Sequence, residues 1–214
     1  MIDGIRYFAT HPQAVIYQTA TALLYPVLFI EVLALIWAVF EFGAFSFEGL
    51  RRRRRNSMRQ VDEVAARASA LLADAKPTAA LEELRTIPAR GWTRTFFAEA
   101  EGADWHERTR LLKRLANLES RISKKLEKTR ILVRIGPMLG LMGTLIPISP
   151  ALIGLAKGDV QTLSDNLVIA FSTTVVGLLI GGLGYIASTV RDRWYGLDVS
   201  DIEYTLDLIE EHLT

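Results

Sequence analysis

Cysteine is absent from the 214-residue chain. That absence excludes disulfide bonds, cysteine-ligated zinc sites and thiol nucleophiles. Histidine is scarce, and His11, His106 and His212 lie far apart without metal-ligand spacing. We therefore expect no metal site, no cofactor and no catalytic residue, and we do not expect an enzyme.

An excess of charge of one sign is also lacking. The 25 lysines and arginines balance the 24 aspartates and glutamates, which leaves a formal net charge of +1. A dedicated nucleic-acid-binding protein usually carries a clear basic excess. The totals therefore exclude nucleic acid as the expected partner.

Charge of either sign is missing from long stretches of the sequence. Residues 167–190 contain no Asp, Glu, Lys or Arg. A helix of that length covers about 36 Å, enough to cross a hydrocarbon core of about 30 Å. Residues 135–156 are likewise uncharged, and only Glu31 interrupts a third apolar stretch over 12–40. The sequence predicts an all-α membrane protein with three transmembrane helices, in contact with membrane lipid.

These stretches divide the chain into seven expected parts. The first apolar stretch is too long, and its start too weakly basic, for a cleaved signal peptide. The expected parts are an external N-terminal segment with an interfacial helix (1–18), transmembrane helix 1 (19–42), a cytoplasmic helical domain (43–133), transmembrane helix 2 (134–156), an external hairpin (157–166), transmembrane helix 3 (167–190) and a cytoplasmic C-terminal helix (191–214).

Basic residues favour one orientation of the three spans. Arginines at 51–55 follow the first span, lysines and arginines over 124–134 precede the second, and Arg191 and Arg193 follow the third. Because positive residues gather on the cytoplasmic side, we expect an external N-terminus and a cytoplasmic C-terminus. Nucleic-acid or anionic-lipid binding is the alternative interpretation of the arginine run.

Helical apolar spacing continues outside the expected spans. Residues 57–75 and 78–87 predict two short helices, and a longer helix is predicted from an N-cap at Asp104 directly into the second span. Apolar stripes on such helices need a partner, and packing within the chain and between subunits both satisfy them. The two stripes are Leu111, Leu115, Leu118, Ile122, Leu126 and Val133, and Val199, Ile202, Leu206, Ile209 and Leu213.

Small residues and prolines mark the second and third spans. Glycines at such spacing let helix backbones approach closely in lipid. Prolines remove backbone hydrogen bonds, so Pro147 and Pro150 are expected to kink the second span. The glycines expected to pack helices are Gly136, Gly140, Gly143, Gly177 and Gly181.

Hydroxyl groups stand in these two spans where carboxylates are missing. Thr144 lies in the inner half of the second span, and residues 172–174 lie in that of the third. Ala170, Thr174, Gly177 and Gly181 share one helical stripe, which suits a close partner helix or a file of water. Each hydroxyl also has a simpler explanation, a hydrogen bond to its own helix. Because hydroxyls do not titrate near neutral pH, a proton crossing here needs a carboxylate from another chain.

Glu31 is the exception, since the pattern places it deep in the first span. A buried acid there is costly unless it is partnered. A direct ion-path role, packing against a hydroxyl, and a position nearer the interface are all open interpretations. An autonomous channel would have only Glu31 to serve as its gating or selectivity group.

Two motifs in the spans resemble the signature of the MotA/TolQ/ExbB proton-channel family. They are GPMLGLMGT at 136–144 and IAFSTTVVGL at 169–178, and the three-span topology is similar to the ExbB/TolQ branch. The resemblance implies a homopentamer in the cell inner membrane, with the second and third spans around a single-span partner similar to ExbD, TolR or MotB. The partner would supply a membrane aspartate. Thr144 and Thr174, with Thr173 beside them, would line the proton pathway.

On this resemblance the protein would convert proton flow into mechanical work on the cell envelope or into transport. Ile169 stands where the ExbB branch carries a glutamate, and Pro147 and Pro150 depart from the usual ExbB continuation. The energised process therefore stays open. The alternative function is a non-conducting oligomeric membrane scaffold or signalling adaptor.

Overall fold

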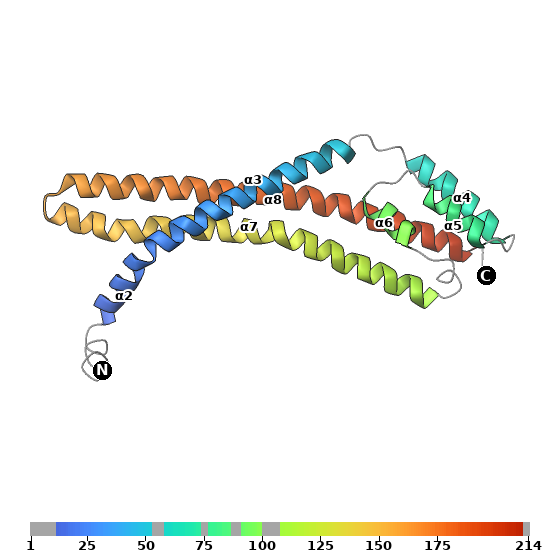
Figure 1. Ribbon diagram of the computed structural model, residues 1–214, viewed down its shortest axis with the longest axis horizontal. Helices are drawn as coiled ribbons and strands as arrows, with labels where there is room; N and C mark the ends of the chain where they lie inside the picture. The colour runs from blue at the N-terminus through green and yellow to red at the C-terminus, as the bar shows by residue number, and fades with distance from the viewer. Residues whose placement is uncertain (1–11, 53–57, 74–76, 87–90, 100–107, 212–214) are drawn as a thin grey trace. The chain divides into compact units, whose positions relative to one another are not determined.

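The computed structural model describes residues 12–52, 58–73, 77–86, 91–99 and 108–211 (Figure 1). Over these residues the chain is helical and contains no strand, which confirms the all-α prediction. The helices are α2 (Pro12–Ala22), α3 (Leu24–Arg52), α4 (Met58–Ala73), α5 (Pro77–Arg85), α6 (Trp92–Glu99), α7 (Arg108–Ala156) and α8 (Val160–Glu211).

Three helical stretches are long and apolar enough to cross a membrane, as the sequence predicts. They are Gln13–Arg52, Thr109–Ala156 and Val160–Asp207. Many of their large apolar side chains are exposed, among them Phe40, Leu145 and Phe171. Exposed apolar surface of this extent suits lipid or neighbouring subunits rather than water.

The first stretch has a break at Leu23, inside the span expected over 19–42. Pro26 has no N–H to donate, and proline fits the first turn of a helix without the loss of a backbone hydrogen bond. The break places Pro26 in the first turn of α3, while the N–H of Leu23 still reaches the carbonyl oxygens of Thr19 and Ala20 at 3.2 and 3.1 Å. Of the expected external segment, residues 1–11, with His11, lie outside the described residues.

The chain forms two compact units, each built from segments distant in the sequence. The first contains Met1–Gly43 and Thr129–Ala187, and the second contains Ala44–Lys128 and Ser188–Thr214. Helices α3, α7 and α8 contribute to both units, because each continues through a boundary between them.

In the first unit, α3 packs on α7 and α8 through an apolar cluster. The α3 members follow one another by seven and four residues, so they share one face of the helix. The cluster consists of Val27, Ala34 and Ala38 from α3, Leu132 and Leu139 from α7, and Ile180 from α8.

The core of the second unit joins α4, α5, α6, α7 and α8. The apolar stripes of α7 and α8, for which the sequence assigns no partner, meet in this core. Ile202 of α8 is buried in one cluster with the α7 stripe, and Val199 and Leu206 pack against that cluster. The packing is within the chain. Leu213 and the side chain of Ile209 lie outside the described residues. The buried α7 members are Leu111, Leu115, Leu118, Ile122 and Leu126.

Helix α7 is continuous over 49 residues, although Pro137, Pro147 and Pro150 lie inside it. This confirms the prediction that the helix before the second span continues into it. The described part of α7 begins at Arg108, and the expected N-cap Asp104, like His106 and His212, lies outside the described residues.

A turn of three residues, 157–159, joins α7 to α8. Gly158 has a φ of 75°, and the N–H groups of Lys157 and Asp159 donate to the carbonyl oxygen of Gly154 at 3.0 and 2.9 Å. Asp159 then caps α8, since its carboxylate accepts from the backbone N–H of Thr162 at 3.0 Å and from the Thr162 hydroxyl. The connection is therefore shorter than the 157–166 hairpin expected from the sequence.

Acidification is expected to loosen the first turn of α8. Hydrogen bonds from the hydroxyl and then the N–H of Thr162 lower the pKa of Asp159. The stabilisation is complete above the ordinary aspartate pKa of about 3.9 and is lost as the pH falls through the lower pKa of the folded state. Hydrogen exchange at Thr162, corrected for intrinsic rates, should show less protection on acidification in the wild type only. The Asp159→Asn variant keeps a capping oxygen without the charge, and an equal pH dependence in both proteins would contradict the prediction.

Candidate functional site

The α7–α8 seam is the line of closest contact between the two helices in the first unit. We define it by Gly136, Gly140, Gly143, Thr173, Gly177 and Gly181. A Cβ atom added to Gly177 would lie 2.6 Å from the carbonyl oxygen of Gly136, and one added to Gly136 would lie 2.7 Å from the backbone N of Gly181. The backbones therefore touch, and these positions hold no larger residue without a shift.

Thr173 packs inside this seam. A Cβ atom on Gly143 would lie 2.5 Å from the Cβ of Thr173, which is buried. The Thr173 hydroxyl donates to the carbonyl oxygen of Ala170 at 2.9 Å. Of the three threonines that the sequence brings together as a proton pathway, Thr173 is the one enclosed between helices of the same chain.

Thr144 and Thr174 are only partly buried. The Thr144 hydroxyl donates to the carbonyl oxygen of Leu141 at 2.7 Å, and the Thr174 hydroxyl donates to that of Ala170 at 3.0 Å. Thr174 also borders the seam, because a Cβ atom on Gly140 would lie 3.5 Å from its Cα. Both hydroxyl oxygens keep lone pairs for an approaching donor.

Neither helix brings a charge to this level. Residues 135–156 of α7 and 166–190 of α8 contain no Asp, Glu, Lys or Arg. Ile169 is partly buried on α8, Pro147 is buried, and α7 stays helical through Pro147 and Pro150. The seam therefore offers hydroxyl and carbonyl oxygens but no group that titrates near neutral pH.

Replacing Gly177 with alanine is expected to destabilise the helix pair by about 1–3 kcal/mol, because the new methyl group overlaps the backbone of α7. Gly182 is a matched control on the same helix, since a Cβ atom there meets nothing within 4 Å. Thermal unfolding in detergent should show a lower midpoint for Gly177→Ala and no loss for Gly182→Ala. Equal midpoints for the two variants would contradict the close contact.

Glu31 lies on the face of α3 that packs against α7 and α8. Its side chain is 3% exposed, and its Oε1 has no hydrogen-bond partner. It shares this face with Val27, Ala34 and Ala38 of the apolar cluster.

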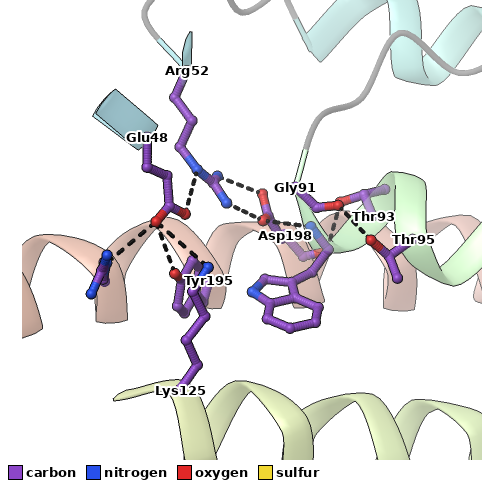
Figure 2. Close-up of polar contacts among 10 residues, drawn as sticks. Glu48, Arg52, Gly91, Thr93, Thr95, Lys125, Tyr195 and Asp198 are labelled. Atoms are coloured by element: carbon purple, nitrogen blue, oxygen red, sulfur yellow. Dashed lines mark hydrogen bonds and ion pairs between the residues drawn. The ribbon is translucent and has the colours of Figure 1, made fainter. Parts of the chain in front are cut away.

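A polar cluster in the second unit, drawn in Figure 2, is not among the sites predicted from the sequence. We call it the Glu48–Asp198 cluster. It joins α3, α6, α7 and α8, and none of its contacts comes from a contiguous motif. Its members are Glu48, Arg52, Trp92, Thr93, Lys125, Arg191, Tyr195 and Asp198.

Asp198 holds one end of this cluster. Arg52 donates to both of its carboxylate oxygens, at 3.0 and 2.7 Å, and the backbone N–H of Trp92 donates to Oδ2 at 3.1 Å. The Thr93 hydroxyl donates to its backbone carbonyl oxygen at 3.1 Å. Asp198 thus caps α6 and neutralises Arg52. Gly91 allows this approach, because a side chain there would collide with both partners, and its φ is 85°.

Glu48 holds the other end. Its Oε2 accepts from the Tyr195 hydroxyl at 3.1 Å and from Arg191 at 3.3 Å, and lies 3.6 Å from the Lys125 ammonium group. Four helices are thereby tied through two carboxylates. Some signal for the cluster is present in the sequence, since Glu48 and Arg52 are four residues apart on α3, and Arg191, Tyr195 and Asp198 fall on one face of α8.

In this cluster each of the two carboxylates accepts hydrogen bonds from at least two donors. Among the residues that the structure describes, no group of three or more His, Asp or Glu side chains is placed to hold a metal ion. The Glu48–Asp198 cluster is therefore an element of assembly for the helices, whereas the seam and Glu31 carry the polar atoms of the apolar stretches.

Comparison with known proteins gives a match at the level of a family. The sequence model of the family described as the MotA/TolQ/ExbB proton channel family matches residues 80–202. The match covers more than half of the chain, includes α7, the seam residues of both helices and Asp198, and does not distinguish the branches of the family. Glu31 and Glu48 precede the matched region. No curated protein matches the chain.

Proposed function

Because the chain belongs to the MotA/TolQ/ExbB proton channel family, we propose that it is the ring-forming subunit of a motor driven by the proton-motive force. Five copies surround the transmembrane helices of a single-span partner similar to ExbD, TolR or MotB. The partner brings the titrating aspartate, and Thr144 and Thr174 line the path along which that aspartate exchanges its proton. The work is done on the cell envelope or in transport.

One observation carries this proposal: two hydroxyls on adjacent helices stand in apolar stretches without any carboxylate. Thr144 and Thr174 are partly buried, and α7 and α8 hold no charge over 135–156 and 166–190. A proton path needs a group that changes charge reversibly, and hydroxyls do not do so near neutral pH. The pair therefore suits a lining around an acid that another chain supplies.

The chain is a multi-pass membrane protein by its family and its three apolar helices. We place it in the inner membrane with the N-terminus outside, since arginines at 51–55 follow the first span and Arg191 follows the third. With this orientation the second unit, including the Glu48–Asp198 cluster, lies in the cytoplasm. Each proton moving through 100 mV releases about 2.3 kcal/mol, so a few protons supply useful mechanical work.

Purification of the tagged chain from its native membrane tests the proposal. We expect an assembly with the mass of five copies and a co-purifying single-span protein with an aspartate in its span. Liposomes containing both chains should conduct protons, and replacement of that aspartate by asparagine should abolish the flux. An assembly without such a protein and without flux would instead support the scaffold or adaptor.

A further inference from the structure

Glu31 is a buried carboxyl group that the proposed motor does not use. It is 3% exposed, and its Oε1 is buried without a hydrogen-bond partner. Buried polar atoms are nearly always paired, and an unpaired one lowers stability, most of all when it is charged. An exception of this kind calls for a function or a change of state.

Among the residues that the structure describes, no charged side chain is a hydrogen-bond partner of the Glu31 Oε1 atom. The cluster on its face of α3 consists of apolar side chains, with Leu132 and Leu139 from α7 and Ile180 from α8. Tyr25 and Tyr185, the titratable groups of the neighbouring apolar stretches, are exposed. The nearest charged residues along the three helices are Glu41 on α3, Arg134 on α7, and Asp165 and Arg191 on α8, with Lys157 in the turn after α7.

An ionised carboxylate in such a place loses its hydration without gaining a partner, which is strongly unfavourable. The neutral acid avoids most of this cost, because only its weak dipole is desolvated. The packing of α3 on α7 and α8 therefore favours the protonated form of Glu31. The ionised form of Glu31 becomes stable only when water or a cation reaches the carboxylate, and this requires the packing of α3 on α7 and α8 to open.

We propose that Glu31 is a proton-binding site of this chain itself, which holds a proton while α3 packs on α7 and α8 and releases it when that packing opens. The site is additional to the aspartate assigned to the partner. It rests on the burial and the vacant hydrogen-bonding position of Glu31, so it stands or falls independently of the ring and of the motor.

Two measurements on the full chain in liposomes test the proposal. Infrared difference spectra between pH 6 and pH 9 should contain the carbonyl band of a protonated carboxylic acid, and Glu31→Gln should remove that band. Dicyclohexylcarbodiimide, a lipid-soluble reagent, should label Glu31. The carboxyl O–H adds across one C=N bond, and the acyl group then moves to nitrogen, so the whole reagent stays on the side chain and is located by peptide mass spectrometry.

The expected labelling of Glu31 is reversible with pH. Above the midpoint of the infrared titration the protonated fraction falls about tenfold for each pH unit, so labelling should fall with the same pH dependence as the carbonyl band. Glu41→Gln is the matched control on α3 and should leave both signals unchanged. Absence of labelling at every pH, or a carbonyl band that Glu31→Gln does not remove, would overturn the proposal. Since Gln is an isostere of the neutral acid, an intact infrared amide spectrum of Glu31→Gln checks its fold.

Discussion

Asp198→Ala is expected to destabilise the second unit by about 3–5 kcal/mol, the range for breaking a buried ion pair by removing one partner. The Asp198 and Arg52 side chains are 3% and 10% exposed, so the substitution leaves the guanidinium group of Arg52 buried without its bidentate partner. It also removes the cap of α6 at the N–H of Trp92. Thermal unfolding in detergent, followed by tryptophan fluorescence, should report the loss through Trp92 and Trp194, which pack against the core of the second unit.

Asp207→Ala provides the control, because Asp207 is an exposed aspartate of the same helix. Surface substitutions of this kind usually change stability by less than about 0.5 kcal/mol. A double variant with Arg52→Ala should lose less than the sum of the two single variants, since residues in one ion pair are not additive. If the two aspartate variants unfolded at the same temperature, the Glu48–Asp198 cluster would have no role in holding the helices.

Thr174→Val and Thr144→Val are each expected to abolish proton-driven work while the assembly stays intact. Valine keeps the shape of the threonine side chain and removes the hydroxyl. Each lost hydrogen bond is made to a carbonyl of the same helix, so the stability should change by about 1 kcal/mol or less. Proton flux in liposomes with the co-purified partner measures the effect, and the mass of the complex in detergent checks assembly.

Ser172→Ala is the matched control for the threonine variants. Ser172 lies two residues before Thr174 on α8, it is exposed, and its hydroxyl also donates to its own helix, at the carbonyl oxygen of Val168. Loss of flux in the two threonine variants with flux retained in Ser172→Ala would support the pathway. Normal flux in both threonine variants would exclude it.

Local patterns were sufficient to predict most of the helices. Charge-free stretches identify the three apolar helices, and the uninterrupted apolar spacing before Gly136 predicts the continuity of α7. These properties depend on residues within a few turns of one another. The bounds of α4 and α5 follow in the same way, within one or two residues, from 57–75 and 78–87.

Long-range contacts explain what the sequence does not predict. Helix α6 begins at Trp92 because Asp198, 106 positions later, accepts from its N–H. The residues directly before Trp92 are Ala89, Arg90 and Gly91, and none of them has a side chain that caps a helix as Ser, Thr, Asp or Asn does. The Glu48–Asp198 cluster could not be predicted for the same reason, since each of its charged residues, taken by itself, is typical of a solvent-exposed side chain.

The helical stripe on α8 could also be identified without its partner. Ala170, Thr174, Gly177 and Gly181 lie on one face by spacing alone, but spacing does not say what covers that face. The structure places α7 of the same chain against Gly177 and Gly181. Close contact between two glycine-containing backbones depends on a pairing of helices that only the folded chain supplies.

The direction of the threonine hydrogen bonds has a consequence for any acid that approaches them. The hydroxyls of Thr144 and Thr174 donate their hydrogens to the carbonyl oxygens of Leu141 and Ala170. Toward any further group, each hydroxyl is therefore only a hydrogen-bond acceptor. A neutral carboxylic acid can donate a hydrogen bond to these hydroxyl oxygens, whereas its anion has no hydrogen to donate and is repelled by them. In the proposed ring, this lining would stabilise the protonated form of the partner's aspartate. Release of its proton would require a different hydrogen-bond donor or a rotation of one threonine hydroxyl.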